Sequence, residues 1–219
     1  MAVGRDSAAL EDVAAADPER VRVAVCDVTD EAAVVALMRD LGPVDVLVNN
    51  AGISDSAPLH RTTLESWHAQ MATNATAVFL FTREVIGDMR TRGQGRIVTV
   101  ASTAGKVGVA YAGAYSASKH AAIGLTRSAA AELAGTGATA NAVCPAFVDS
   151  EFTQVTAARV AERTGRTHQE SVEALATLAP LGRLLDPGEV ADAVVWLASP
   201  SADAVNGQTI VLDGGGIQT

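Results

Sequence analysis

The sequence has few aromatic residues, no long apolar run and fewer basic than acidic side chains. Aromatic residues make up 4% of the 219 residues, so a core must rest mainly on Ala, Val, Leu and Ile. The 16 Lys and Arg residues against 25 Asp and Glu give a net charge of −9, and no basic stripe offsets it, which argues against nucleic acid as a partner. No apolar run reaches the roughly 20 residues that cross a bilayer, and the N-terminus lacks a signal-peptide stretch. We therefore expect neither nucleic acid nor a membrane as a partner.

The chain has only two cysteines, Cys26 and Cys144, and both lie in apolar, strand-like runs. They lack the spacing of metal ligands, so we expect no metal site and no disulfide. Small buried thiols of this kind are typical of a reducing compartment, and a cytoplasmic location is expected.

Strand and helix patterns alternate along the chain without a repeat or a linker. Such alternation predicts one α/β domain over residues 1–219, a doubly wound parallel sheet of Rossmann type covered on both faces. Thr62 and Glu65 predict a capping box, and Asp186 followed by Pro187 predicts another helix start. The predicted strands are Val21–Cys26, Asp45–Val48, Arg96–Ala101, Ala138–Cys144 and Gln208–Leu212, and the main predicted helices are Glu31–Leu41, Thr63–Met89 and Ala112–Leu133.

Tyr115 and Lys119 are four residues apart in a predicted helix, so they share one face. A free phenol, with a pKa of about 10, is a poor acid–base catalyst at neutral pH. A nearby ammonium favours the phenolate and is expected to lower that pKa. A tyrosine tuned in this way can give a proton to a carbonyl oxygen and take it back in the reverse reaction.

Four further positions each carry a structural and a functional interpretation. Ser102 closes a strand and is either a strand-end cap or a donor to a substrate oxygen. The Asn49–Gly52 stretch is either a turn or a loop that lines a cofactor cleft. Asn74 lies in mid-helix, where an exposed Asn is the simple explanation. Asp27 follows a strand and could cap a helix, accept a hydrogen bond from an adenine amino group, or do both.

Taken together these residues resemble the short-chain dehydrogenase/reductase family, and the resemblance covers essentially the whole chain. It is most similar to bacterial reductases of 3-oxoacyl thioesters and aromatic polyketides. The motifs that carry it, in family order and spacing, are Asp27-Val28, Asn49-Asn50-Ala51-Gly52, Asn74, Ser102, Tyr115-Ser116-Ala117-Ser118-Lys119, Asn141-Ala142-Val143-Cys144-Pro145 and Asp213-Gly214-Gly215.

The resemblance implies a role for each matching residue. Tyr115 is the acid/base, Lys119 lowers its pKa and holds the nicotinamide ribose, and Ser102 positions the carbonyl. Asn74 supports the water of a proton relay behind Lys119. The positions implied to lie along the cofactor are Asp27, Val28, Asn50, Ala51, Gly52, Pro145, Val148 and Ser150. The cofactor supplies the hydride.

The sequence departs from the family pattern at two places. Ala146 stands where the family usually has glycine after the proline, a minor change unless the backbone there needs a positive φ. The family's first strand, its Thr-Gly-x-x-x-Gly-x-Gly loop and its first helix are absent, so either the true start lies upstream or the chain is a fragment. We expect the central strand of the sheet to be missing and NADP(H) to bind residues 1–219 weakly, because that loop and helix hold the pyrophosphate.

The resulting hypothesis is hydride transfer between NADP(H) and a ketone/alcohol pair, with a 3-oxoacyl thioester or a related ketone as substrate. Gly4 and Arg5 favour NADP, since Arg5 can pair with a 2′-phosphate. The alternatives are an NAD-dependent secondary-alcohol dehydrogenase and a non-catalytic remnant that acts as an interaction partner. Residues 151–178 are expected to form a mobile lid over the substrate. A homotetramer, or at least a homodimer, is expected through the two long helices.

Overall fold

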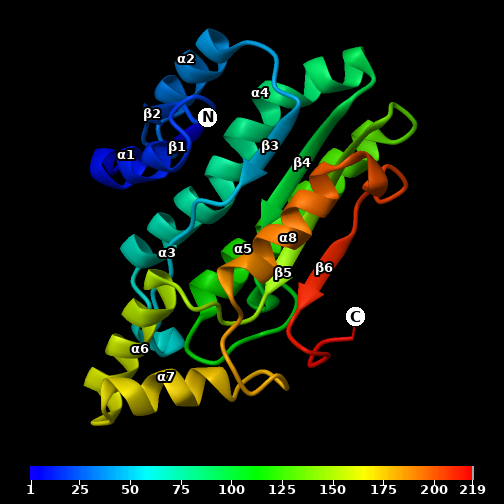
Figure 1. Ribbon diagram of the computed structural model, residues 1–219. Coiled ribbons are helices and arrows are strands. Elements are labelled where there is room, and N and C mark those ends of the chain that lie inside the picture. The colour runs from blue at the N-terminus through cyan, green and yellow to red at the C-terminus, as the bar shows by residue number, and fades with distance from the viewer. Residues whose placement is uncertain (219) are drawn as a thin grey trace.

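The computed structural model describes residues 1–218, in which six short parallel strands alternate with helices (Figure 1). The strands are β1 (Ala2–Gly4), β2 (Val23–Val25), β3 (Val46–Asn49), β4 (Gly95–Val100), β5 (Ala138–Pro145) and β6 (Thr209–Leu212). The helices are α1 (Ser7–Ala16), α2 (Glu31–Leu41), α3 (Leu64–Met71), α4 (Ala77–Arg92), α5 (Gly113–Leu133), α6 (Glu151–Thr164), α7 (His168–Ala176) and α8 (Pro187–Ala198). Each predicted strand is confirmed to within two residues at either end.

The strands form two separate parallel sheets. One sheet pairs β1 with β2, and the other has the order β3-β4-β5-β6. Within the described residues β3 pairs only with β4, so its other edge is open. Val46 and Val48 of β3 are about two-fifths exposed, although apolar strand residues are ordinarily covered. The predicted gap in the sheet is therefore present, and the remaining strands do not close it.

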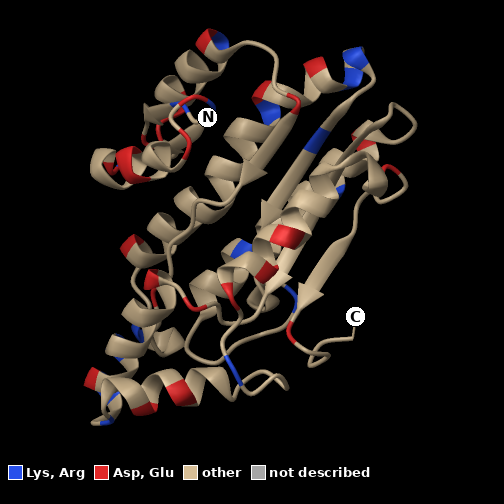
Figure 2. Cartoon of the chain, in the orientation of Figure 1, with Lys and Arg blue, Asp and Glu red and all other residues tan. Residues whose placement is uncertain are grey.

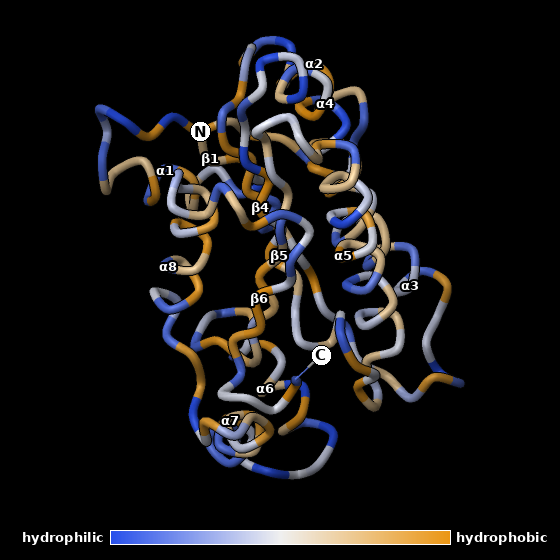
Figure 3. The backbone as a smooth tube through the Cα atoms, turned by 90° about the vertical axis from the view of Figure 1, so that its right-hand side faces the viewer, coloured by the Kyte–Doolittle hydropathy of each residue, from blue (hydrophilic) through white to orange (hydrophobic). Residues whose placement is uncertain are grey.

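Helices cover both faces of the four-stranded sheet, as the predicted doubly wound arrangement requires. Alternate residues of β4 face opposite ways: Ile97 packs in a core with Leu80 and Leu133 of α4 and α5, whereas Val98 packs with Leu197 of α8. Figure 3 shows the strands between α8 on one side and α5 on the other. Charged residues gather on helices and loops, and the strands are almost free of them (Figure 2).

Helix ends follow the local sequence, with one correction. Asp186 caps α8 as predicted, and it forms a capping box with Glu189; Gly42 ends α2 with a φ of 74°. The capping box predicted at Thr62 is wrong, because Thr63 is the cap of α3 and its side chain accepts from the Ser66 amide. Thr62 instead ends a short 3₁₀ turn, η1 (Leu59–Arg61).

The predicted helix over Thr63–Met89 is interrupted in its first half. A π-helical turn, η2 (Ala72–Thr76), separates α3 from α4. Residues 151–178 form α6 and α7, which lie beyond the carboxyl ends of the strands (Figure 1). Across residues 1–218, none of the helices has the length and apolar character to span a membrane.

Candidate active site

The residues with predicted chemistry meet at the carboxyl ends of the strands. Asn49 ends β3, Ser102 follows β4 and Pro145 ends β5. Because these strands are parallel, their carboxyl ends share one edge of the sheet, which is where ligands bind in such folds. Helix α5 carries Tyr115 and Lys119 to this edge, and Lys119 Nζ donates to the Val100 carbonyl oxygen at 3.0 Å.

Lys119 is a buried cation beside the ring of Tyr115. Its Nζ lies 5.9 Å from the ring centroid, and the residue is 5% exposed. Burial lowers the pKa of Lys119 to about 8, against a weaker opposing influence of Cys144. The ammonium has three N–H groups and one protein acceptor in the described chain, so it retains donors for a bound molecule.

The expected lowering of the Tyr115 pKa is not found. Burial raises the pKa of the Tyr115 phenol, and a hydrogen bond with the Ser102 side chain offsets this only in part. Burial dominates because it disfavours the charged phenolate, and the influence of Lys119 is not among the causes of the shift. The phenol therefore stays protonated at neutral pH, which is the state that a proton donor needs.

Asn74 is fully enclosed in the π-helical turn, so the interpretation as an exposed Asn is wrong. Its Oδ1 accepts from the Ile53 amide at 2.9 Å, and its Nδ2 donates to the Ile53 carbonyl and to Ser118 Oγ, each at 2.9 Å. Gly52 lies beside it: a Cβ added there would stand 3.4 Å from both Asn74 Oδ1 and Lys119 Nζ. π-Helical turns are frequent at functional sites, and this one brings Asn74 close to the buried lysine.

Ser102 is a cap residue at the end of β4, and its role as a donor to a substrate oxygen stays a prediction. Its Oγ accepts from the Ala104 amide at 3.1 Å and so caps a short 3₁₀ helix, η3 (Thr103–Gly105). The same side chain interacts with the phenol of Tyr115. The cap fixes the hydroxyl at the strand end, where it faces the tyrosine.

Comparisons with known proteins place this fold among related reductases. A family profile described as enoyl-(acyl carrier protein) reductase matches residues 2–216. A 3-oxoacyl-[acyl-carrier-protein] reductase of Vibrio cholerae is 41% identical over 185 residues, covering 84% of this chain and 71% of the relative. An acetoacetyl-CoA reductase of Rhizobium meliloti is 42% identical over 176 residues, covering 80% of this chain and 69% of the relative.

A crystal structure of an actinorhodin polyketide ketoreductase variant with NADPH superposes with a TM-score of 0.89 at 37% identity. It covers 97% of this chain, and this chain covers 85% of it. The chain belongs to the short-chain dehydrogenase/reductase family. It is accordingly an oxidoreductase, and the predicted fold class is confirmed.

The residues predicted for the adenosine end of this short-chain dehydrogenase/reductase lie at the ends of β1 and β2. Arg5 Nη1 is 3.8 Å from Asp27 Oδ2, and both side chains are largely open to solvent. Asp27 Oδ1 also accepts from the Thr29 amide at 2.9 Å and from Thr29 Oγ1 at 2.7 Å, and these two bonds are the main cause of its lowered pKa. The helix-cap interpretation of Asp27 is wrong, because Asp30 caps α2. Val28 packs its side chain against the core under α4.

The loop after β3 and the segment after β5 border the same edge. Asn50 and Ala51 are exposed there, whereas the Asn49 side chain turns inward and its Nδ2 donates to Thr82 Oγ1 at 3.4 Å. Beyond Pro145, Val148 forms an isolated bridge with Leu185, and Ser150 is the cap residue of α6.

Alanine fits at position 146. Its amide donates to the Leu212 carbonyl at 2.9 Å, which continues the pairing of β5 with β6. Among the non-glycine residues of the described chain, positive φ occurs at Tyr111 and not at Ala146. The departure from glycine therefore introduces no backbone strain.

Phe152 and Arg159 on α6 belong to the site region but were not predicted. The Phe152 ring lies 6.2 Å from that of Tyr115 and is tilted by 43°. Both residues line a hollow of about 330 Å³ between α6 and the loop after β3, together with Gly52, Ile53, Ser54, Glu151, Val155 and Thr156. The only sequence signal was a lone aromatic residue in a polar segment.

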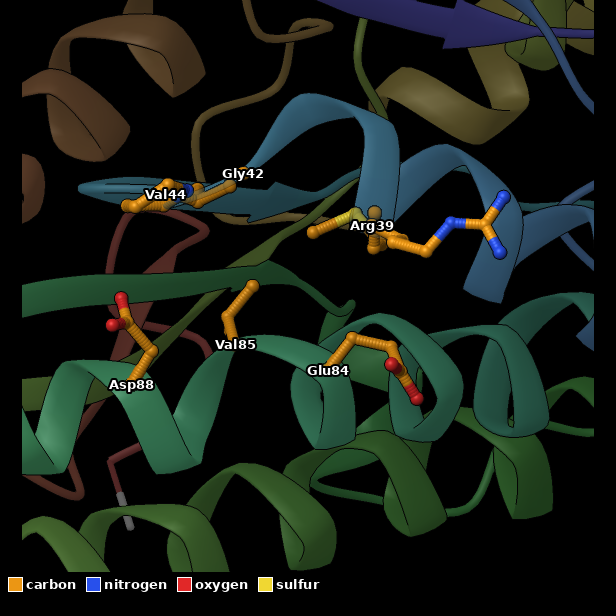
Figure 4. A pocket seen from close by; sticks show the side chains of 8 residues that line it. Arg39, Gly42, Val44, Glu84, Val85 and Asp88 are labelled. Atoms are coloured by element: carbon orange, nitrogen blue, oxygen red, sulfur yellow. The ribbon is translucent and has the colours of Figure 1, made fainter.

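A second hollow of about 290 Å³ lies away from this site, between α2 and α4 (Figure 4). Arg39 reaches it from α2, and Glu84, Val85 and Asp88 reach it from α4. None of the predicted site residues lines it. Over residues 1–218, no group of three His, Cys, Asp or Glu side chains is arranged to hold a metal ion.

Proposed function

We propose that this protein is an NADP(H)-dependent ketoreductase whose substrate is a 3-oxoacyl thioester or a related ketone. The observation that carries the proposal is that Tyr115, Lys119, Ser102 and Asn74 converge at the carboxyl ends of the strands. The buried Lys119 ammonium among them has N–H groups available for a bound molecule. The relatives named as 3-oxoacyl and acetoacetyl reductases support the substrate class.

The residues at the strand edge fit the nicotinamide half of NADP(H). Lys119 is buried with one carbonyl partner, and its free N–H groups suit ribose hydroxyl acceptors. Gly52 leaves the space beside Lys119 and Asn74 clear of a side chain. At the other end Arg5 is an exposed guanidinium suited to a 2′-phosphate, which supports NADP over NAD. When bound, the cofactor supplies the hydride that reduces the ketone carbon.

Tyr115 and Ser102 act on the carbonyl oxygen. The Ser102 hydroxyl donates to this oxygen and holds it within reach of the phenol. Tyr115 then gives its proton as negative charge develops on the oxygen, and the raised pKa keeps that proton available at neutral pH. Lys119 faces the resulting phenolate, and its charge stabilises it. Asn74 supports the water through which the proton is replaced behind Lys119.

Assembly is the second part of the proposal. Two long helices, α5 and the α3–α4 pair, are proposed to join copies of the chain into a homodimer or homotetramer. Trp67 on α3 and Phe79 on α4 are 37% and 44% exposed, which leaves apolar surface for such contacts. Val195 and Trp196 on α8 add a second exposed apolar site, which the sequence pattern did not reveal.

The test is acetoacetyl-CoA-dependent oxidation of NADPH, with NADPH in the millimolar range because weak binding is expected. Tyr115→Phe should lower kcat by at least about 1,000-fold, since it removes the proton donor. Tyr111→Phe is the matched control: this exposed tyrosine lies four residues earlier, and its variant should keep wild-type turnover. If Tyr115→Phe retains half of the activity, the assigned mechanism is wrong. Crotonyl-CoA replaces acetoacetyl-CoA in a parallel assay, and turnover of the enoyl thioester alone would show an enoyl reductase instead.

A further inference from the structure

The Ile53–Ser56 segment, which follows the loop after β3, is held on one side by α3 and the π-helical turn. Asn74 binds both backbone groups of Ile53 at 2.9 Å. The Asp55 amide donates to Gln70 Oε1 at 3.2 Å, and the Asp55 carboxylate accepts from Ser66 Oγ at 2.8 Å. Ile53 is thus tied to the π-helical turn that carries Asn74, and Asp55 is tied to the adjoining helix α3.

The even-numbered residues of the same segment are tied to α6. Arg159 Nη1 donates to the Ser54 carbonyl oxygen at 2.6 Å. Arg163 Nη1 donates to the Ser56 carbonyl oxygen and to Ser56 Oγ, the latter at 3.3 Å. Arg159 and Arg163 are four residues apart and therefore share one face of α6. The two carbonyl groups that they reach, those of Ser54 and Ser56, are two residues apart, so each guanidinium group has its own carbonyl partner.

Helix α6 also contacts Tyr115 and forms one wall of the hollow next to the loop after β3. Phe152, at its N-terminal end, packs against the tyrosine ring, and Phe152 and Arg159 both line the 330 Å³ hollow. Any outward movement of α6 would widen this hollow and break both arginine–carbonyl contacts. The Ile53–Ser56 segment would then lose its contacts with α6, while Asn74, Gln70 and Ser66 would still hold Ile53 and Asp55.

We propose that Arg159 and Arg163 are positioning residues that couple the closure of α6 over the substrate to the placement of Asn74 and Gly52 beside Lys119. The link runs from α6 through two arginine–carbonyl bonds into the Ile53–Ser56 segment, and from there through the Ile53 backbone to Asn74. Its effect on turnover rests on the proposed ketoreductase function, whereas its effect on structure does not.

The arginine–carbonyl bonds carry this link, not the charge of Asp55. Arg159 Nη1 is 3.8 Å from Asp55 Oδ1, and both side chains are about two-fifths exposed, so solvent screens that ion pair. A guanidinium that donates at 2.6 Å to a carbonyl oxygen makes a charge-assisted hydrogen bond, which is the stronger interaction. Asp55→Asn should therefore have little effect, whereas removal of the guanidinium should have a large one.

Hydrogen exchange measured by mass spectrometry tests the link without any need for turnover. In Arg159→Ala/Arg163→Ala, the amides of α6 and those of Ile53 and Asp55 should exchange about ten-fold faster than in wild type. Arg166→Ala is the matched control, because Arg166 follows α6 and is absent from the contacts with the segment. The conservative double variant, Arg159→Lys/Arg163→Lys, keeps both charges and should fall between wild type and the double alanine variant.

The reverse perturbation should act on α6. Ser66→Ala removes the bond to Asp55 from the opposite side, and reciprocity of coupling requires faster exchange in α6 as well. Faster exchange in α6 with no change at Ile53 and Asp55 would overturn the coupling. Unchanged exchange in both regions of the double alanine variant would overturn the role of the two arginines.

Steady-state kinetics provide the second measurement. The double alanine variant should raise the KM for acetoacetyl-CoA about ten-fold, because an open α6 no longer encloses the substrate. The KM for NADPH should rise as well, because Asn74 and Gly52 border the nicotinamide half of the proposed cofactor site. An unchanged KM for acetoacetyl-CoA beside faster exchange would show that the contact is only structural, which contradicts the proposal. Absence of turnover in wild type would instead count against the proposed function and leave the exchange result to decide the coupling.

Discussion

The buried ammonium of Lys119 makes the stability of the fold depend on pH in a way that one substitution can isolate. Its pKa falls from 10.5 to about 8 on folding, because burial disfavours the charged form. Between these two values the unfolded chain binds more protons than the native state, so the free energy of unfolding should rise with pH. Lys119→Met fills similar space without a titrating group, and its stability should lack that rise.

The size of the effect follows from the two pKa values. Each pKa unit corresponds to about 1.36 kcal/mol, so wild type should gain about 2–3 kcal/mol relative to Lys119→Met between about pH 7 and about pH 10. The lost hydrogen bond to the Val100 carbonyl affects both pH values equally and cancels in the difference. The comparison is best made in a Tyr115→Phe background, because that substitution removes the neighbouring phenol, which would otherwise titrate as well.

Urea unfolding followed by circular dichroism at the two pH values measures this difference directly. The change in the free energy of unfolding with pH should be more positive in the lysine-containing protein. An identical pH dependence of the two proteins, within about 0.5 kcal/mol, would show that Lys119 keeps its ordinary pKa and is not desolvated. The conclusion that the Lys119 ammonium is shielded from water would then be wrong.

Four other predictions concern activity and assembly. The kcat/KM for ketone reduction should fall as pH rises through about 8, because Lys119 loses the charge that stabilises the phenolate, and a flat profile across that range would contradict this role. Ser102→Ala should lower kcat about 100-fold, as expected for the loss of one donor to the carbonyl oxygen, which steady-state kinetics would measure. Arg5→Ala should weaken NADPH binding about ten-fold and leave NADH binding unchanged in a fluorescence titration, whereas equal losses for both would refute the 2′-phosphate contact. Light scattering at micromolar concentration should give the mass of at least a dimer, and a monomeric mass would refute the proposed assembly.

Local sequence predicted most of the fold because the deciding interactions are local. The Val-rich strands have apolar residues on both faces, and Asp186 and Glu189 are a complete capping signal within four residues. The start of α3 could not be predicted to the residue, because Thr62 and Thr63 are both good helix caps. The preceding 3₁₀ turn decides between them. Helix α1 was not predicted. Leu10 is its only buried residue, so its sequence shows no helical spacing of apolar residues.

The chemistry of the site was predictable to the extent that it lies within one helix or one strand end. Tyr115 and Lys119 share one face of α5, and Ser102 follows the end of β4. Long-range contacts were not predictable, because Arg159 and Ser54 are 105 residues apart in the sequence. The direction of the Tyr115 pKa shift was also missed, since it depends on how much apolar protein surrounds the ring and not on the spacing to Lys119.

The division of the strands into two sheets has a consequence for how the molecule comes apart. No backbone ladder within residues 1–218 joins β1 and β2 to the other four strands, and the two parts meet through side chains of the core that joins Cys26, Val34 and Met38 to α4. Side-chain contacts without a shared backbone ladder, the exposed Arg83–Glu31 ion pair included, permit opening of one part while the other stays folded. Residues 1–41 should therefore behave as a separate cooperative unit that opens at lower free energy than β4 and β5. Arg5 and Asp27 lie in that unit, and Tyr115 and Lys119 lie in the other, so the two ends of the proposed cofactor site would be held in register by the side-chain contacts between α2 and α4.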